Sequence, residues 1–385
     1  MSKCLYVYAW DFIDEGTDAV LERIKSLGID GIAMAVTYHA GRFILPHNPK
    51  RRVYFPEDGT AYFRPRDRYY SGPIKPKTAS MLGSGDTLAE VAEGCKRFGL
   101  SLTAWTVCLH NTRLGTQHPE FTARNAYGDH YLYCLCPAQP PAAEYALGLV
   151  EDLTANYSLD TIFLEALGYM GFAHGFHHEI SAVRLNASQE ALLSLCFCDA
   201  CAARAAESGI DAAHIAGIVR DQLAPVFSSE TDVSSPGFEE IVADEPELAA
   251  YLGMRRDVVI ELLEKAKEIA GGRGVRTDYF GPSPCSRALS EATDMPRAGA
   301  IADRYVLPVG VPDLEAIRSD IECVIGSVPS EKLILSINLG INSTPTRENY
   351  LERLSLLGDY SLAGCNLYNY SILPLERMQW IRESR

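Results

Sequence analysis

The stretch Ser158-Leu-Asp-Thr-Ile-Phe-Leu-Glu-Ala-Leu-Gly168 decides the fold that this sequence predicts. Its centre, Thr161 to Leu164, is an apolar and partly β-branched run with apolar side chains on both faces. Such a strand is typical of a parallel sheet whose outer side is covered by helices. Because side chains alternate along a strand, Glu165 shares a face with Phe163. The stretch therefore predicts a buried strand that ends in a carboxylate.

The same passage from helix to strand occurs earlier in the chain. Leu27-Gly-Ile-Asp-Gly-Ile32 resembles Tyr157-Ser-Leu-Asp-Thr-Ile162, which indicates a repeated β-α unit. Hydrophobic patterns predict strands at 4–11, 29–36, 101–108, 161–165, 275–280, 301–307, 333–339 and 364–370. They predict helices at 17–27, 86–98, 142–156, 189–208, 212–227, 255–270, 314–325, 347–357 and 375–382.

Eight strands, nearly all followed by helices, predict an α/β protein of the (β/α)8 TIM barrel type, with residues 1–385 as one domain. An open doubly wound sheet is the alternative. No glycine-rich dinucleotide-binding motif follows an early strand, so we prefer the barrel.

Two long insertions interrupt the expected alternation. Residues 39–84, after the second strand, are rich in Arg, Lys, Tyr and Pro, and we expect a cap-like loop over the barrel mouth. Its basic side chains could bind an anionic ligand, but pairing with the protein's own acidic groups is the interpretation we favour. Residues 170–273, after the fourth strand, form a mainly helical insertion.

The composition limits the partners and the compartment. Fifty Asp and Glu against 35 Lys and Arg give a net charge of −15, which disfavours nucleic acid and anionic membranes as partners. The first residues lack the features of a secretion signal, and no apolar run approaches the roughly 18 residues of a membrane span. Eleven cysteines in such a chain indicate reduced thiols, without a disulfide framework, in the cytoplasm. A homo-oligomer is compatible with the sequence.

Polar and aromatic residues gather near the predicted strand ends, which meet at one mouth of a barrel. Aromatic faces stack on sugar rings, and amides, imidazoles and carboxylates bind hydroxyl groups, so we expect a small carbohydrate substrate. The candidate substrate-binding residues are Trp10, Asp11, His39, Trp105, His110, Tyr169, His177, His178, Tyr279, Asp303, Asn338 and Tyr368.

Glu165 and Asp278 are the candidate catalytic pair, because they lie on adjacent predicted strands. Glycoside hydrolysis generally uses two carboxyl groups, about 5–5.5 Å apart for retention and about 6.5–9.5 Å apart for inversion. One would hold a proton as the acid and the other would be ionised, and no cofactor is required. Asp11 and Asp303 are reserve candidates. The alternative is structural: Glu165 closes its strand, and Asp278 pairs with an arginine of the insertion.

A second titratable cluster follows the fourth strand, at His174, His177, His178 and Glu179. It could form a lip that binds substrate hydroxyls, or contribute to a metal site with Glu165. The alternative is a group of solvated loop histidines.

Cys196-Phe-Cys-Asp-Ala-Cys201 places three thiols at the C-x-C-x2-C spacing. Tetrahedral zinc needs a fourth ligand, which Cys134, Cys136, Cys108 or a histidine could supply. With that ligand, Cys196, Cys198 and Cys201 would hold a structural zinc. Without it, they are small apolar residues of a helix.

The alternating strands, the glutamate of the fourth strand and the loop after it resemble the glycoside-hydrolase-type TIM barrels, including bacterial chains described only as hypothetical glycosyl hydrolases. The Cys196–Cys201 spacing is similar to the zinc cluster of the family 42 β-galactosidases, whose barrel also carries a catalytic glutamate on strand four. Two features depart from that pattern. Leu164-Glu165 replaces the usual Asn-Glu pair, and Ser336-Ile-Asn-Leu-Gly340 offers only Asn338 where a strand-seven glutamate is expected. β-Galactosidase activity is therefore not implied.

The sequence predicts a glycosidase that acts on an oligosaccharide or glycoside. One alternative is a metal-dependent sugar isomerase or epimerase, with Glu165, Asp278 and histidines around one divalent ion. The other is a sugar-binding barrel without catalysis.

Overall fold

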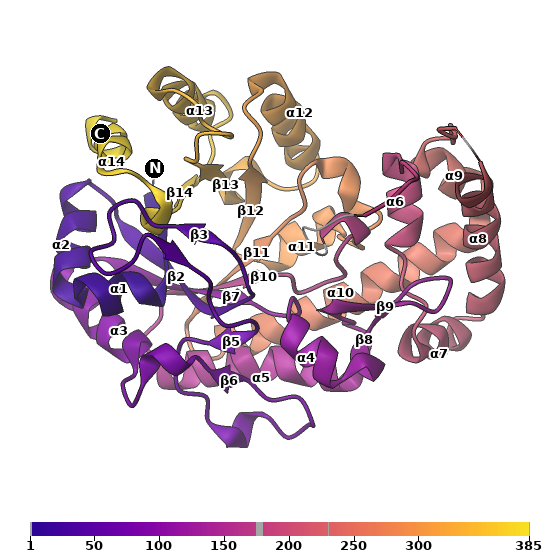
Figure 1. Cartoon of the computed structure of the whole chain (residues 1–385), viewed down its shortest axis with the longest axis horizontal. Helices are drawn as coiled ribbons and strands as arrows, with labels where there is room; N and C mark the ends of the chain where they lie inside the picture. The colour runs from indigo at the N-terminus through magenta and orange to yellow at the C-terminus, as the bar shows by residue number, and fades with distance from the viewer. Residues whose placement is uncertain (1, 175–179, 230, 385) are drawn as a thin grey trace.

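The computed structural model describes residues 2–174, 180–229 and 231–384, and in this part of the chain eight parallel strands close into a barrel (Figure 1). Closure is achieved because the first strand pairs with both the second and the last. The (β/α)8 prediction is thereby confirmed. The barrel strands are β1 (Ser2–Val7), β2 (Gly31–Tyr38), β7 (Ser101–Val107), β10 (Thr161–Glu165), β11 (Arg276–Phe280), β12 (Arg304–Val309), β13 (Leu333–Asn338) and β14 (Gly364–Tyr368).

Aromatic rings fill the barrel interior. Tyr6 contacts Trp105 at 4.9 Å between ring centroids and Phe163 at 6.2 Å, and Phe163 contacts Phe280 at 5.6 Å. The apolar residues that alternate with these, such as Ile162 and Leu164, are fully buried. Phe163 therefore points into the barrel, and Glu165, two residues later on the same strand, shares its face.

Helices cover the outside of the barrel (Figure 1). In α12, Ile317, Ile321 and Val324 are buried at helical spacing, and the helix has the predicted bounds. In the described ranges no helix is both long and apolar enough to span a membrane. The helices are α1 (Ala9–Glu15), α2 (Thr17–Ser26), α3 (Thr87–Phe98), α4 (Thr112–Gln117), α5 (Pro140–Asn156), α6 (Ala187–Leu193), α7 (Asp199–Glu207), α8 (Ala212–Ser228), α9 (Phe238–Asp244), α10 (Pro246–Gly271), α11 (Met295–Ile301), α12 (Leu314–Ile325), α13 (Arg347–Asp359) and α14 (Leu375–Glu383).

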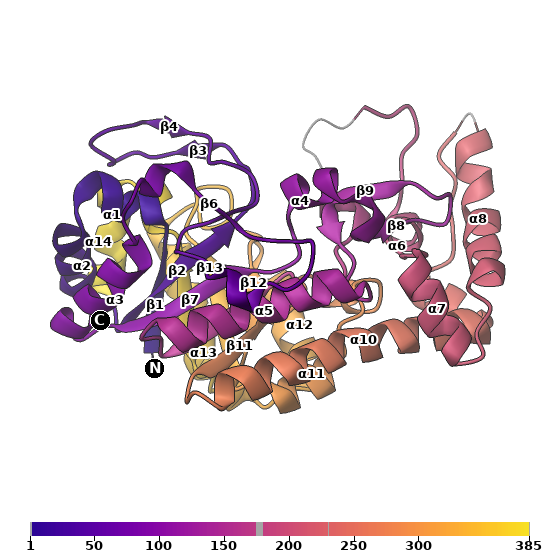
Figure 2. The same cartoon turned by 90° about the horizontal axis from the view of Figure 1, so that it is seen from below.

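The segment after β2 contains four short strands, β3 (Phe43–Ile44), β4 (Val53–Tyr54), β5 (Thr60–Ala61) and β6 (Lys77–Thr78). The β3–β4 hairpin lies over α1 (Figure 2). It packs Phe43 and Tyr54 against Trp10, with ring centroids 5.3 Å and 5.0 Å apart. Aromatic packing therefore holds this hairpin against the helix that follows β1.

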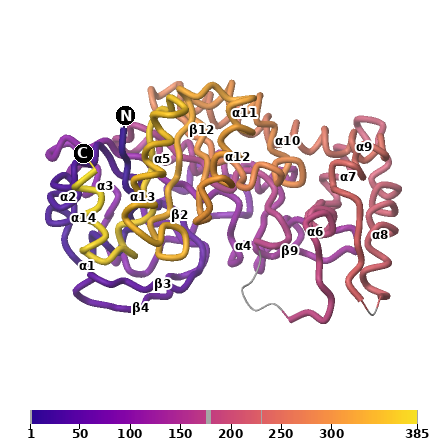
Figure 3. Tube along the Cα trace, turned by 90° about the horizontal axis from the view of Figure 1, so that it is seen from above, coloured from indigo at the N-terminus to yellow at the C-terminus, as the bar shows by residue number. Residues whose placement is uncertain are grey.

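Helices α6 to α9 form a lobe beside the barrel, and α10 leads from the lobe back to it (Figures 2 and 3). The lobe has its own apolar cluster, which includes Ile215, Leu223 and Leu248. The single helix predicted at 189–208 is wrong, because α6 and α7 are separated by the segment that carries Cys196 and Cys198. A further hairpin, β8 (Thr122–Arg124) and β9 (His130–Leu135), lies in a stretch for which the sequence predicts neither a strand nor a helix.

Two predicted strands have different bounds in the structure. The first strand ends at Val7, so that Trp10 and Asp11 belong to α1. The sixth begins at Arg304, because α11 occupies the apolar residues at its predicted start. Asp303 therefore precedes its strand and lies at the amino end of the barrel, away from the mouth where the prediction placed it.

Cys285 and Cys323 form a disulfide, contrary to the expectation of reduced thiols throughout. The two residues are 38 positions apart in sequence but have Cα atoms 6.5 Å apart. Cys285 lies in the loop after β11 and Cys323 in α12, and adjacent β-α units bring these segments together. The bond ties the loop after β11 to the helix of the next unit.

Arg353 offers a test of how the mouth loops are held. This fully buried arginine donates hydrogen bonds to the carbonyl oxygens of Val309, at the end of β12, and of Val311 and Ser343, in the loops after β12 and β13. Arg353→Met leaves these carbonyls without donors and should lower the free energy of unfolding by about 3 kcal/mol. Arg382→Met, at an exposed position of α14, should change it by less than about 0.5 kcal/mol in the same urea titration.

Candidate active site

A cavity of about 470 Å³ lies at the carboxyl end of the barrel strands. Active sites of barrel enzymes lie at this end, because the loops after all the strands meet there. Three successive β-α connections and α12 form the walls. The lining residues that matter for chemistry or shape are Glu165, Gly168, Tyr169, Gly171, His174, Tyr279, Phe280, Arg287, Glu291 and Asp320.

Glu165 ends β10 and lines this cavity. The indole Nε1–H of Trp105, on the adjacent strand β7, donates to Glu165 Oε2 at 2.5 Å. Burial raises the pKa of Glu165 to about 7, although the hydrogen bond from Trp105 acts in the opposite direction. A carboxyl group with this pKa is partly protonated at neutral pH and can act as a general acid.

Three tyrosine hydroxyls form a hydrogen-bonded chain beside Glu165. Tyr8 Oη donates to Tyr38 Oη at 2.9 Å, and Tyr8 Oη and Tyr368 Oη are also 2.9 Å apart. Burial raises the pKa of Tyr38 and Tyr368, and the charge of Glu165 raises both further. The phenols therefore stay neutral and can donate or accept hydrogen bonds at the mouth. The predicted residue Tyr368 is thus part of this hydrogen-bonded chain.

Histidines from three loops contact one another: His39 stacks on His110, and His174 meets His110 edge to face. The ring of His39 lies 4.3 Å from Tyr38 and 4.2 Å from His110, and His110 lies 4.9 Å from His174. Burial, together with the neighbouring His39 and His174, lowers the pKa of His110 to about 2, so His110 is neutral. His174 lines the cavity with Glu165. The predicted residues His177 and His178, with Glu179, lie outside the described residues.

Asp278 does not share the cavity with Glu165. In the β10–β11 register it is the partner of Phe163, which places it one inward-facing layer below Glu165 inside the barrel. Its Oδ1 lies 3.4 Å from Nε of Arg304. Burial raises the pKa of Asp278 to about 6, and Arg304 opposes this shift. The structure therefore does not bring the predicted catalytic pair together.

Four other predicted residues have structural contacts away from the cavity. Trp10 is fully buried and stacks on Tyr8, and Asp11 accepts hydrogen bonds from the Tyr8 N–H and the Ser371 hydroxyl. Asp303 pairs with Lys267 and accepts from the Thr277 N–H. Asn338 accepts from the N–H of Gly340 at 2.8 Å. Each of these side chains stabilises a turn, a helix start or a strand end.

Tyr169 and Tyr279 both line the cavity, as predicted from their positions after β10 and within β11. Tyr279 Oη lies 3.5 Å from the Thr293 hydroxyl. Tyr169 Oη lies 3.3 Å from Cys201 Sγ, and the guanidinium of Arg255 lies 4.1 Å from its ring centroid. Tyr169 thus connects the cavity wall to the cysteines of the lobe.

Glu291 is a cavity residue that the sequence analysis missed. It lies in the loop after β11, its side chain is 15% exposed, and it forms an ion pair with Arg287. Burial raises the pKa of Glu291, whereas Arg287 lowers it. The arginine–glutamate spacing of four residues was the available signal. The stretch around Glu291 has no strand or helix periodicity, so the sequence alone does not place this residue at the barrel mouth.

Four buried thiols meet where the β8–β9 hairpin contacts the lobe. Cys136 Sγ lies 3.8 Å from Cys196, 3.5 Å from Cys198 and 3.5 Å from Cys201. All four sulfur atoms lie within 4.8 Å of one another. Zinc–sulfur bonds of about 2.3 Å in a tetrahedron require sulfur atoms about 3.8 Å apart, so the four thiols fit a zinc ion. Cys136 is one of the four alternatives considered for the fourth ligand.

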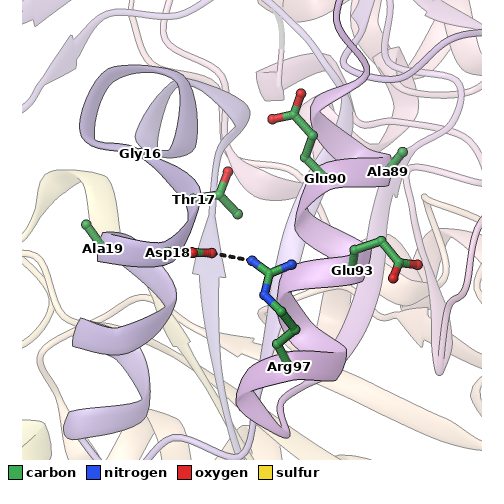
Figure 4. Close-up of a pocket in the computed structure, with 8 residues that line it drawn as sticks. All are labelled: Gly16, Thr17, Asp18, Ala19, Ala89, Glu90, Glu93 and Arg97. Atoms are coloured by element: carbon green, nitrogen blue, oxygen red, sulfur yellow. Dashed lines mark hydrogen bonds and ion pairs between the residues drawn. The ribbon is translucent and has the colours of Figure 1, made fainter.

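A larger groove of about 750 Å³ lies between α2 and α3, in the outer helical layer (Figure 4). Its polar side chains include Asp18 and Arg97, which pair with each other across the groove. Both side chains are more than half exposed, so the pair is strongly screened by water. The groove lies away from the strand ends, and we assign the candidate site to the smaller cavity that contains Glu165.

No protein-family model matches the sequence, and no curated protein sequence matches it either. Solved structures are similar over the whole chain. The glycoside hydrolase domain of PgaB (BpsB) from Bordetella bronchiseptica is 14% identical with a TM-score of 0.62, covering 100% of this chain and 98% of that one. A β-galactosidase from Marinomonas ef1 is 12% identical with a TM-score of 0.55, and 58% of its chain is covered. The catalytic domain of a Paenibacillus polymyxa β-amylase is 11% identical with a TM-score of 0.55, and 97% of it is covered. At these identities the similarity establishes a shared barrel fold.

The raised pKa of Glu165 predicts a pH-dependent stability. Between its ordinary value of 4.5 and about 7, the folded state keeps a proton that the unfolded state has lost. The stabilising contribution is full below about pH 4.5 and is lost as the pH rises to about 7. Glu165→Gln cannot ionise, so it should be more stable than the wild type at pH 8 by about 2 kcal/mol, after allowance for partial exposure.

Urea unfolding at pH 4.5 and pH 8 measures this difference, and exposed Glu352→Gln is the matched control. The difference in the free energy of unfolding between Glu165→Gln and the wild type should disappear at pH 4.5. An equal difference in this free energy at both pH values would show that Glu165 has an ordinary pKa.

Proposed function

We propose that this chain hydrolyses a glycosidic bond in an oligosaccharide or glycoside, with Glu165 as the proton donor. The observation that carries the proposal is a carboxyl group with a pKa of about 7 at the carboxyl end of the fourth barrel strand, inside a cavity. A protonated carboxyl can give its proton to the glycosidic oxygen as the bond from the anomeric carbon to that oxygen breaks.

The surroundings of Glu165 support a sugar as the substrate. Trp105 fixes the carboxyl group through its indole N–H, and the cavity wall carries the aromatic side chains of Tyr169, Tyr279 and Phe280. Aromatic and hydroxyl-bearing walls suit a ligand with both apolar ring faces and hydroxyl groups. PgaB, the β-galactosidase and the β-amylase, which share the fold, are glycosidases by name, and this agrees with the proposal.

The predicted isomerase alternative would need Glu165, Asp278 and histidines around one divalent ion. In the described ranges, the potential metal ligands that cluster are four cysteines, and Glu165 belongs to no such cluster. Asp278 pairs with Arg304 in the layer below. The geometry therefore favours acid–base hydrolysis over that alternative. A sugar-binding barrel without catalysis would use the same cavity, and only an activity measurement separates it.

Glu165→Gln tests the function directly. The amide keeps the size of the side chain but cannot donate the proton, so kcat should fall about 10²–10⁴-fold on glycosides with poor leaving groups. Aryl glycosides and oligosaccharides of both anomeric configurations are suitable substrates, with circular dichroism to verify folding and Glu352→Gln as the control. Full activity of Glu165→Gln would refute the assigned role. Sugar binding by the wild type without turnover of any glycoside would favour the binding barrel.

We also propose that Cys136, Cys196, Cys198 and Cys201 hold a structural zinc ion. The sulfur–sulfur distances suit a tetrahedral ion, and all four ligands come from the protein, as in sites that stabilise folds. The ion would join the hairpin that carries Cys136 to the lobe that carries the other three. Bound zinc would keep the thiols deprotonated and would supply folding energy at this junction.

Metal analysis of purified protein should find about one zinc per chain. Cys201→Ser should lose most of this zinc and lower the melting temperature by several degrees, because the lobe loses its attachment to the hairpin. Cys95→Ala is the control, since Cys95 is a buried cysteine of α3 outside the cluster. Equal zinc content in the wild type and Cys201→Ser would refute the site.

A further inference from the structure

We propose that Glu291 is the second carboxylate of the reaction, with Arg287 as its ion-pair partner. Glu291 would remove a proton from the attacking water while Glu165 protonates the leaving oxygen. This inference rests on the glycosidase function proposed above. It replaces Asp278, which the sequence indicated, with a residue from the loop after β11.

Glu165 and Glu291 line the same cavity. Glu291 packs against the segment that directly follows Glu165. A Cβ atom on Gly168 would lie 3.6 Å from the Glu291 carbonyl oxygen, and one on Gly171 would lie 3.2 Å from Glu291 Oε1. The contact at Gly171 is tight, because a Cβ there would press on the Glu291 carboxyl group. The Glu291 side chain therefore lies directly against the segment after Glu165, on the wall of the cavity that both residues line.

The loop that carries Glu291 is fixed at several points. Arg287 donates to the Ser283 carbonyl oxygen at 3.2 Å as well as pairing with Glu291. Asp320 of α12 accepts from the Ser283 hydroxyl at 2.9 Å and from the Cys285 N–H at 3.0 Å. The disulfide between Cys285 and Cys323 joins the same loop and helix. A catalytic group on a loop needs such support to keep its geometry.

The two carboxyl groups have different surroundings, and this difference is the basis of the proposed roles. Burial raises the pKa of both groups, and Arg287 opposes this shift at Glu291. Glu165 receives a hydrogen bond from the neutral Trp105 indole, whereas Glu291 pairs with the Arg287 cation. An adjacent cation favours the ionised form, and burial next to neutral groups favours the protonated form. Further groups that act electrostatically on or with Glu291 from neighbouring elements are Arg255, Tyr133, Tyr279 and Tyr305.

The step balances with one water molecule. The water oxygen forms a bond to the anomeric carbon, and the bond from that carbon to the leaving oxygen breaks, with its electron pair passing to the oxygen. Glu165 gives this oxygen a proton, and Glu291 takes one proton from the water. Glu165 ends ionised and Glu291 ends protonated, and transfer of a proton through solvent restores the starting state.

Glu291→Gln and Arg287→Met test the inference on a glycoside that the wild type cleaves. Glu291→Gln should lower kcat by at least about 10²-fold, because an amide cannot take the proton. Arg287→Met should stay active but shift the acidic limb of the kcat/KM profile to higher pH, because without the cation Glu291 ionises less readily. A purely structural arginine would lower activity without moving this limb. Exposed Glu352→Gln should leave both rate and profile unchanged.

The outcomes separate this inference from the function on which it rests. If the wild type cleaves no glycoside, the proposed function fails and the inference fails with it. If Glu165→Gln is inactive but folded Glu291→Gln keeps the wild-type rate, the inference is overturned while the function stands. If Glu291→Gln does not fold, the Arg287→Met profile decides, and an unshifted acidic limb overturns the inference.

Discussion

The register of the parallel strands is the constraint on which the rest of this structure depends. All eight barrel strands run in the same direction, and β1 pairs with β14 to close the barrel. The depth of each residue in the barrel therefore follows from its place along its strand. Glu165 ends its strand and reaches the cavity, whereas Asp278, paired with Phe163, lies one layer deeper. A displacement of two residues thus separates a candidate acid from a buried ion pair with Arg304.

Burial gives the candidate acid its chemistry at a cost to stability. The aromatic interior removes water from Glu165, and the neutral Trp105 N–H compensates the carboxylate only in part. The protonated form is therefore favoured up to about pH 7, and the stabilising contribution of this proton is lost as the pH rises from about 4.5 to about 7. Burial raises the pKa of Glu291 as well, but the Arg287 cation in the same cavity opposes that shift. The two glutamates thus differ in the charge of their neighbours: a neutral indole for Glu165 and a cation for Glu291.

Helices and strands could be predicted from the sequence because the spacing of their apolar residues reflects which side chains are buried. The bounds of α12 and the strand that ends in Glu165 follow from apolar spacing alone. Asp303 was misplaced because the apolar residues before it form α11 and not a strand. Glu291 lies in a loop whose path depends on contacts with Asp320 and a disulfide, and no local pattern encodes these. Cys136 could not be selected as the fourth ligand because only folding brings it to the Cys196–Cys201 segment.

The lobe is connected to the cavity through shared side chains. Tyr169 lines the cavity and lies 3.3 Å from Cys201 Sγ through its hydroxyl, so one ring contacts both the cavity and the cysteine cluster. Arg255 stacks on that ring and donates to the Ser290 carbonyl oxygen, one residue before Glu291. The loop after β11 therefore has support on two sides, from α12 and from the lobe. The insertion after the fourth strand thus supports the wall of the cavity, because Cys201 contacts Tyr169 and Arg255 connects the Tyr169 ring to the Glu291 loop.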